Sequence, residues 1–361
     1  MKQGRAHLGL VGLGVMGQNL ALNFADHGFR VAVFNRSPEK TREFLQRLDP
    51  ERGIVPAWTP EELVARLDPP RVILLMVAAG PAVDELLDRF TQLLAPGDVV
   101  LDGGNSHFRD TQRRGAALAG RGFRFLGLGI SGGELGARYG PCLMPGGDEA
   151  GYELVRPLLE KIAAWVNGEP CVAYLGPGAA GHFVKMVHNG IEYALEQLLA
   201  EAYDLLHRGL GLNYQELAEI FTKFNEGELR SYLVEITGQI FRRRDPQTGQ
   251  PLVALIRDVA GQKGTGIWTS QAALDLGVPI PTIDMAVALR HLSARWEERQ
   301  AAAALLPGPG PFLPQDPEGL GFIDKLAQAL YAGMVMAFAQ GLALLRRASE
   351  EYGYGVDLET V

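Results

Sequence analysis

The N-terminal region contains a glycine motif that restricts how the chain can fold. An apolar segment, Leu8–Val11, is followed at once by Gly12-Leu13-Gly14-Val15-Met16-Gly17. In a dinucleotide-binding βαβ unit the first glycine permits the tight turn after the strand, and the second lets the backbone approach the pyrophosphate. The third allows close packing of the helix on the strand, and the helix N-terminus attracts the anion. We predict that these six residues bind a dinucleotide; the alternative is a tight strand-to-helix turn without a ligand.

The pattern along the rest of the chain predicts an α/β domain followed by an all-helical one. Short β-branched segments alternate with helical patterns, which is typical of a parallel, doubly wound sheet. After Gly176-Pro177-Gly178 the pattern becomes helical, first from Ala179 to about Arg208 and then onward. We therefore predict a Rossmann-like domain over residues 1–178 and a helical substrate and dimerisation domain over residues 179–361. The predicted strands are Leu8–Val11, Val31–Phe34, Val72–Val77, Val99–Asp102 and Arg124–Leu128, and a Pro/Gly-rich loop is predicted at Leu306–Gly321.

Composition excludes several classes of protein. The net charge of −8 argues against a nucleic-acid-binding surface. Two cysteines, Cys142 and Cys171, imply no disulfide framework and fit a reducing, cytoplasmic compartment. Ala329–Leu345 is apolar, but it is shorter than the ~20 residues of a membrane span and contains Gln340. We expect this segment to be a buried core or dimer helix and predict no membrane partner.

The residues after the second predicted strand indicate which dinucleotide binds. An NAD site usually has Asp or Glu there to hold the ribose 2′-hydroxyl. This chain has Asn35-Arg36-Ser37, which contains no carboxylate to repel a 2′-phosphate. The Arg36 guanidinium could pair with that phosphate and stack on adenine. We predict NADP as the cofactor; the alternative for Arg36 is an exposed loop arginine.

One predicted helix carries an unusual polar stripe. At about 100° per residue, the five polar residues of the segment from Phe183 to Tyr193 fall on one face. Lys185 and Glu192 are two turns apart and nearly eclipsed, so they are a plausible base and acid. The alternative is a solvated stripe on an amphipathic helix. The five residues are Lys185, His188, Asn189, Glu192 and Tyr193.

Three turn segments offer further ligands. Asp102-Gly103-Gly104-Asn105-Ser106 follows a predicted strand, at the carboxyl edge where open sheets bind ligands. Ser131-Gly132-Gly133 offers a hydroxyl and backbone N–H groups that suit a carboxylate. Lys263-Gly264-Thr265-Gly266 places a cation, a hydroxyl and amides together, which suits a phosphate. Taken alone, each of the first two is more often an ordinary turn.

With these motifs in place, the chain resembles the decarboxylating 6-phosphogluconate dehydrogenase family over its whole length. The polar helix and the Lys-Gly-Thr-Gly segment are the most specific matches. The resemblance implies a homodimer that binds NADP and 6-phosphogluconate without a metal. It implies that Tyr193, Lys263, Thr265 and Arg290 hold the substrate phosphate. It also implies that the sugar acid is surrounded by Asn105, Ser131, Gly132, Gly133, Lys185, His188, Asn189, Glu192 and Tyr193, and that Val77 and Asn105 contact the cofactor.

The same resemblance implies an oxidation followed by loss of CO₂. Lys185, as a neutral amine favoured by burial, would take the proton of the C3 hydroxyl during oxidation. The resulting ammonium would polarise the new carbonyl while CO₂ leaves. Glu192 would then protonate C1 of the enediol to give ribulose 5-phosphate.

The sequence departs from the family pattern in three places. Ala78 and Ile267 stand where the family often has lysine. The third departure is the end at Val361, where the long-chain family continues with a tail that adds an Arg and a His to the partner's site. We expect either a fragment or a shortened form, so a catalytically weak NADP-binding dimer module stays an alternative. A 3-hydroxyacid dehydrogenase of similar architecture is a further alternative, but it does not explain the Lys263–Thr265 motif.

Overall fold

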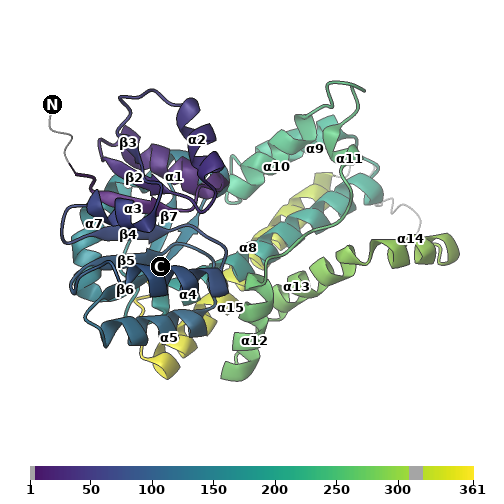
Figure 1. Ribbon diagram of the computed structural model, residues 1–361. Coiled ribbons are helices and arrows are strands. Elements are labelled where there is room, and N and C mark those ends of the chain that lie inside the picture. The colour runs from purple at the N-terminus through teal and green to yellow at the C-terminus, as the bar shows by residue number, and fades with distance from the viewer. Residues whose placement is uncertain (1–4, 309–319) are drawn as a thin grey trace. The chain divides into compact units, whose positions relative to one another are not determined.

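The computed structural model describes residues 5–308 and 320–361 (Figure 1). The chain forms two compact units. The first consists of the residues up to Met186 together with Leu345–Val361, and the second is Val187–Leu344. The boundary between these units differs from the predicted domain boundary at Gly178, and that domain division stays a prediction.

The first unit is built on a seven-stranded sheet in the order β3-β2-β1-β4-β5-β6-β7. All neighbouring strands are parallel except β6 and β7, which are antiparallel, so the predicted all-parallel sheet needs this correction at one edge. The parallel order confirms the Rossmann-like fold class. The strands are β1 (Leu8–Val11), β2 (Val31–Phe34), β3 (Ile54–Pro56), β4 (Val72–Leu75), β5 (Val99–Asp102), β6 (Arg124–Ser131) and β7 (Cys142–Gly147).

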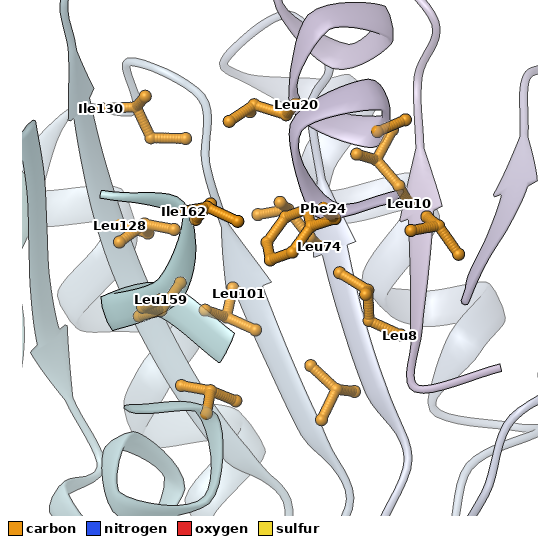
Figure 2. Close-up of a cluster of buried hydrophobic side chains, with 14 of the residues drawn as sticks. Leu8, Leu10, Leu20, Phe24, Leu74, Leu101, Leu128, Ile130, Leu159 and Ile162 are labelled. Carbon is orange, nitrogen blue, oxygen red and sulfur yellow. The ribbon is translucent and has the colours of Figure 1, made fainter. Parts of the chain in front are cut away.

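Helices cover both faces of this sheet, because alternate residues of its buried strands point to opposite sides. On one face, Leu8, Leu74 and Leu128 pack with Phe24 and Leu159 from two helices (Figure 2). On the other face, strand residues such as Ile73 and Val100 pack with side chains of α3, α4 and α5. The helices are α1 (Val15–Asp26), α2 (Pro38–Gln46), α3 (Pro60–Ala65), α4 (Pro81–Phe90), α5 (Phe108–Ala119), α6 (Gly133–Tyr139) and α7 (Glu149–Ile162), and the short strands β8 (Trp165–Val166) and β9 (Glu169–Pro170) pair with each other.

The helix α8 (Ala180–Asp204) confirms the predicted long helix and continues into a π-helical turn, η1 (Leu205–Gly209) (Figure 1). Leu199 of α8 and Leu206 of η1 belong to the core of the second unit, where they pack with Phe221 of α9 and Phe241 of α10. The remaining helices are α9 (Tyr214–Phe224), α10 (Tyr232–Arg242), α11 (Leu252–Leu255), α12 (Thr265–Leu276), α13 (Pro281–Ala294), α14 (Trp296–Leu305) and α15 (Leu320–Tyr352).

The apolar segment Ala329–Leu345 forms the middle of α15. Gln340 is buried, and its side chain bonds Thr282 through both the backbone N–H and the hydroxyl. Large apolar side chains on the same helix are nevertheless exposed, among them Met336 (56%) and Phe338 (49%). In the single chain one face of this helix is therefore buried and another is exposed, and the expectation of a core or dimer helix stays a prediction. In the described part of the chain, Gly321–Tyr352 is the one helix that is long and apolar enough to cross a membrane, which is weak evidence by itself.

The predicted Pro/Gly-rich loop, Leu306–Gly321, lies mostly outside the described residues. Its first residue caps α14, and α15 already begins at Leu320.

Candidate active site

The three glycines of the N-terminal motif differ in the space around them. A Cβ atom on Gly12, whose φ is 101°, would lie 2.3 Å from the Met76 carbonyl oxygen. A Cβ atom on Gly17 would lie 2.0 Å from the Gly12 carbonyl oxygen. A Cβ atom on Gly14 would meet nothing within 4 Å. The first and third positions therefore require glycine for packing, whereas the second faces open space beside the N-terminus of α1. This space fits a pyrophosphate.

Asn35 orders this loop. The Leu13 backbone N–H donates to Asn35 Oδ1 at 3.0 Å, and Asn35 Nδ2 donates to the Ser37 carbonyl at 3.1 Å. The neighbouring Arg36 is exposed. Asn35 thus joins the end of β2 to the glycine loop, while Arg36 extends its charge into solvent, where a 2′-phosphate could reach it.

The segments that follow β4 and β5 lie against each other at the same carboxyl edge. A Cβ atom on Gly103 would lie 2.6 Å from Met76 Sδ, and one on Gly104 would lie 2.9 Å from the Val77 carbonyl oxygen. Asn105, the next residue, is exposed. The predicted cofactor contacts Val77 and Asn105 are therefore held on two closely packed loops.

Lys185 is not a surface lysine. The residue is 6% exposed, and a Cβ atom on Gly129 of β6 would lie 2.5 Å from Lys185 Cβ. The solvated-stripe alternative therefore fails for this residue. Burial raises the pKa of the nearby Cys142 thiol, with Cys171 acting in the same direction and Lys185 in the opposite one.

The Ser131-Gly132-Gly133 turn ends the strand on which Lys185 packs. Ser131 pairs with Cys142 in the antiparallel register of β6 and β7. Gly132 and Gly133 both have positive φ, 118° and 60°, and both are exposed. The turn therefore needs glycine for its backbone and presents its amides to solvent.

In the second unit, α8 contacts the start of α12. Asn189 Nδ2 donates to Thr265 Oγ1 at 3.2 Å, and a Cβ atom on Gly266 would lie 2.7 Å from Tyr193 Cε2. Thr265 is buried, and Gly264 precedes it with a φ of 104°. The predicted phosphate motif and the polar stripe of α8 are thus in direct contact.

Arg290 of α13 completes this cluster. Its guanidinium carbon lies 3.5 Å from the centroid of the Tyr193 ring, and Nη1 donates to the Gly261 carbonyl at 2.6 Å. Its Nη2 forms an ion pair with Glu196. Asn189, Tyr193, Thr265 and Arg290 therefore form one cluster, whereas Lys263 is exposed.

His188 and Glu192 lie one turn apart on α8, with His188 Nε2 and Glu192 Oε2 3.8 Å apart. Both side chains are about a third exposed, at 36% and 39%. A carboxyl with this exposure can exchange its proton with solvent, which suits a group that delivers a proton.

Two residues of this region were not predicted from the sequence. Burial raises the pKa of Glu196, while the Arg290 guanidinium opposes that shift. Glu196 lies four residues after Glu192 and therefore on the same face of α8, so the sequence did contain a signal for this residue. Arg114, which is buried and bonds Ser106, carried no such signal because its partner Asp84 is 30 residues away. Among the described residues, no group of three or more potential metal ligands occurs.

Comparison with known proteins agrees with this arrangement. The model for the NAD binding domain of 6-phosphogluconate dehydrogenase matches residues 7–176, and the model for its C-terminal domain matches residues 181–361. A decarboxylating 6-phosphogluconate dehydrogenase of Synechococcus elongatus is 52% identical over 97% of this chain and 74% of its own length.

Two proteins of Bacillus subtilis bear cofactor names. The one named NADP(+)-dependent is 50% identical over 97% of this chain and 74% of its own length. The one named NAD(+)-dependent is 49% identical over 98% of this chain and 75% of its own length. The solved Plasmodium falciparum 6-phosphogluconate dehydrogenase, described with NADP+ and with 6-phosphogluconate, superposes with a TM-score of 0.93 at 41% identity, over 98% of this chain and 76% of its own. The chain belongs to the 6-phosphogluconate dehydrogenase family.

Proposed function

We propose that this chain catalyses the NADP-dependent oxidative decarboxylation of 6-phospho-D-gluconate to D-ribulose 5-phosphate, CO₂ and NADPH. The observation that carries the proposal is α8. It buries Lys185 against β6 and, in its next turns, bonds Asn189 to Thr265 and stacks Tyr193 under Arg290. One helix therefore carries a buried amine for the reacting carbons and, in later turns, two side chains that contact the proposed phosphate residues Thr265 and Arg290.

In the proposed reaction Lys185 acts first. Its neutral amine takes the proton from the C3 hydroxyl of the sugar acid while C3 is oxidised to a ketone. The C1 carboxylate is then β to a carbonyl, and the new ammonium polarises that carbonyl. The bond between C1 and C2 breaks, CO₂ leaves, and the electron pair forms an enediol as the C3 oxygen takes the proton back from the Lys185 ammonium. Glu192 protonates the terminal carbon of the enediol, which becomes C1 of ribulose 5-phosphate.

The substrate phosphate is proposed to bind at the start of α12. Thr265 supplies a hydroxyl at the N-terminus of a 12-residue helix, where backbone N–H groups favour an anion. Arg290 and Lys263 supply positive charge, and the Tyr193 ring orients the Arg290 guanidinium. This cluster favours a phosphorylated sugar acid over the small substrates of a 3-hydroxyacid dehydrogenase.

Turnover measurements distinguish the proposed activity from its alternatives. We expect NADPH formation with 6-phosphogluconate and at least a hundredfold lower kcat/KM with gluconate, because a phosphate with several charge-assisted contacts is worth about 3 kcal/mol or more. Equal rates with gluconate would favour a 3-hydroxyacid dehydrogenase. Tight NADP binding without turnover would favour the catalytically weak module.

The proposed cofactor preference rests on Arg36. When bound, NADP supplies the acceptor for the hydride at its nicotinamide ring. The residues fit it, because Gly14 leaves room for the pyrophosphate and the end of β2 has no carboxylate. Arg36→Asp should weaken NADP binding about tenfold to a hundredfold more than NAD binding, since it removes a charge-assisted pair and adds repulsion.

Cofactor titration with each dinucleotide measures this difference. Arg47→Asp, an exposed arginine at the end of α2, makes the same change in net charge and should leave the NADP to NAD ratio unchanged. An equal loss for both cofactors in the Arg36 variant would contradict the assignment.

The homodimer is also a proposal. The exposed apolar residues of α15, Tyr331, Val335, Met336 and Phe338, form a surface that a second copy of the chain could bury.

A further inference from the structure

Arg114 of α5 is a fully buried cation in the first unit. Its side chain is 1% exposed, although arginine is rarely buried unless it is paired. Each of its three guanidinium nitrogens has a partner: Nε donates to Asp84 Oδ1 at 2.9 Å, Nη2 donates to Asp84 Oδ2 at 2.9 Å, and Nη1 donates to Ser106 Oγ at 3.2 Å. All three nitrogens of the planar guanidinium group therefore donate hydrogen bonds.

These contacts join two loops that are far apart in the sequence. On the β4 side, Arg114 bonds the Gly80 carbonyl at 2.9 Å in addition to Asp84 at the start of α4. On the β5 side, Nη1 also lies 3.4 Å from Asp102 Oδ2, at the end of the strand. One guanidinium thus spans the β4–α4 and β5–α5 loops.

The β5 side of the cluster is closed by further bonds. Ser106 Oγ donates to Asp102 Oδ2 at 2.6 Å, and the Gly104 N–H donates to Asp102 Oδ1 at 3.1 Å. Asp102 is completely buried. Asn105 lies between Gly104 and Ser106, so both of its neighbours are tied to the carboxylate that Arg114 contacts.

A buried cluster of charged groups contributes little net stability to a fold. Moving a guanidinium and a carboxylate out of water carries a desolvation penalty that often cancels their attraction, and apolar residues of similar volume can replace such pairs without loss. Its geometric effect is specific, because a bidentate arginine fixes the direction as well as the distance of its partners. The distance between the two loops is what the cluster determines.

We propose that Arg114 is a positioning residue that sets the separation of the two loops carrying Val77 and Asn105, and thereby the placement of the nicotinamide ring for hydride transfer. The inference rests on the proposed function, in which these two residues contact the cofactor. The adenine half of the cofactor is assigned to the β1–α1 turn and Arg36. The hydrogen bonds of Arg114 go instead to Gly80, Asp84 and Ser106. A shift of the two loops should therefore affect only the nicotinamide end.

Arg114→Lys tests this role, because lysine keeps the charge but lacks the fork that spans both loops. Arg113→Lys is the matched control. Arg113 is adjacent, also bonds Asp84 at 3.0 Å, and has a side chain that is 58% exposed. Asp84→Asn is a second variant that weakens only the β4 side. The readouts are kcat, the deuterium isotope effect for C3 of the substrate, NADPH fluorescence on binding, and the affinity for 2′,5′-ADP, which lacks the nicotinamide.

For Arg114→Lys and Asp84→Asn we expect kcat to fall about 10- to 100-fold, as for a misplacement of about 1 Å. The isotope effect should rise, and NADPH should lose affinity, while 2′,5′-ADP binds within about twofold of the wild type. Arg113→Lys should behave as wild type.

Unchanged kcat and NADPH affinity in both variants would overturn the inference, and so would a parallel loss of 2′,5′-ADP binding, which indicates a general structural role. If the wild type itself does not oxidise 6-phosphogluconate, the proposed function fails. The ratio of NADPH to 2′,5′-ADP affinity would still test the positioning role in that case.

Discussion

At the scale of single residues, Lys185 is the side chain on which the chemistry depends. A lysine in an apolar helical segment is either a base or a solvated charge, and the sequence leaves both possibilities open. The close approach of Gly129 to Lys185 decides against the solvated position, since only a residue without a side chain lets β6 come so near. The Lys185 side chain thus leaves α8 on the side that faces the sheet.

Lys185→Met should abolish oxidation while leaving cofactor binding intact. Methionine keeps the length and apolar stem of the side chain but cannot accept a proton, so kcat should fall by about 10²- to 10⁴-fold. NADPH formation and NADP titration measure the two effects separately. Lys161→Met, which changes an exposed lysine of α7, is the control. Substantial turnover in the Lys185 variant would remove this residue as the base.

Glu192→Gln should act after oxidation. Glutamine keeps the shape of the side chain and cannot deliver a proton at the same rate, so ribulose 5-phosphate formation should slow by about 10²-fold or more. Slower solvent-deuterium incorporation at C1 would reveal the changed step. Glu201→Gln, on an exposed turn of α8, should have no effect. An unchanged overall rate for Glu192→Gln would exclude it as the acid.

Some site residues could be predicted and others could not, for a physical reason. Motifs made of consecutive residues, such as the glycine loop and Lys263–Gly266, can be recognised from the sequence because their functional groups are neighbours along the chain. Arg114 was not predicted, and Arg290 was named only through the family resemblance, because their partners are 30 and 94 residues away. Their pairing arises from the packing of helices, which no local pattern specifies.

At the scale of elements, the buried parallel strands were the easiest to predict. β1, β2 and β5 have the predicted bounds because each is short and almost entirely apolar. β3 and β7 were missed. β3 ends in Pro56, and β7 contains Pro145 and two glycines, which are unfavourable in central strands. Both lie at sheet edges, where proline is tolerated, so their strand character comes from the sheet and not from their own propensity.

The β1–α1 turn makes a paired prediction possible. Gly17→Ala should destabilise the fold by about 1–3 kcal/mol, because its Cβ would overlap the Gly12 carbonyl. Gly14→Ala should change stability by less than about 0.5 kcal/mol, because its φ of −71° suits alanine and its Cβ faces open space. It should still weaken NADP binding, since that space is assigned to the pyrophosphate.

Thermal or denaturant unfolding and NADP titration of both variants separate the two effects. A stable Gly14→Ala variant with unchanged NADP affinity would contradict the placement of the cofactor.

At the scale of the whole molecule, a buried histidine should make stability depend on pH. His182 of α8 is 2% exposed, and its Nδ1 lies 2.6 Å from Thr111 Oγ1. Burial lowers its pKa from the usual 6.5, with Asp102 opposing the shift and Arg114 adding to it. The unfolded chain therefore binds a proton below pH 6.5 that the folded chain resists, and stability should fall as the pH decreases through that value.

Unfolding midpoints at about pH 7.5 and pH 5.5 measure this effect. His182→Gln removes the titrating group and should show a smaller decrease in midpoint than the wild type over the same interval. Equal decreases in both proteins would show that other groups carry the pH dependence.

The central claim is that oxidation and decarboxylation occur together in this chain. The most direct measurement is the amount of CO₂ released per NADPH formed, with 6-phosphogluconate as substrate and purified wild-type protein. We predict one CO₂ for each NADPH, and neither product with Lys185→Met. NADPH formation without CO₂, or CO₂ and NADPH formation that persists in the Lys185 variant, would contradict the proposed reaction.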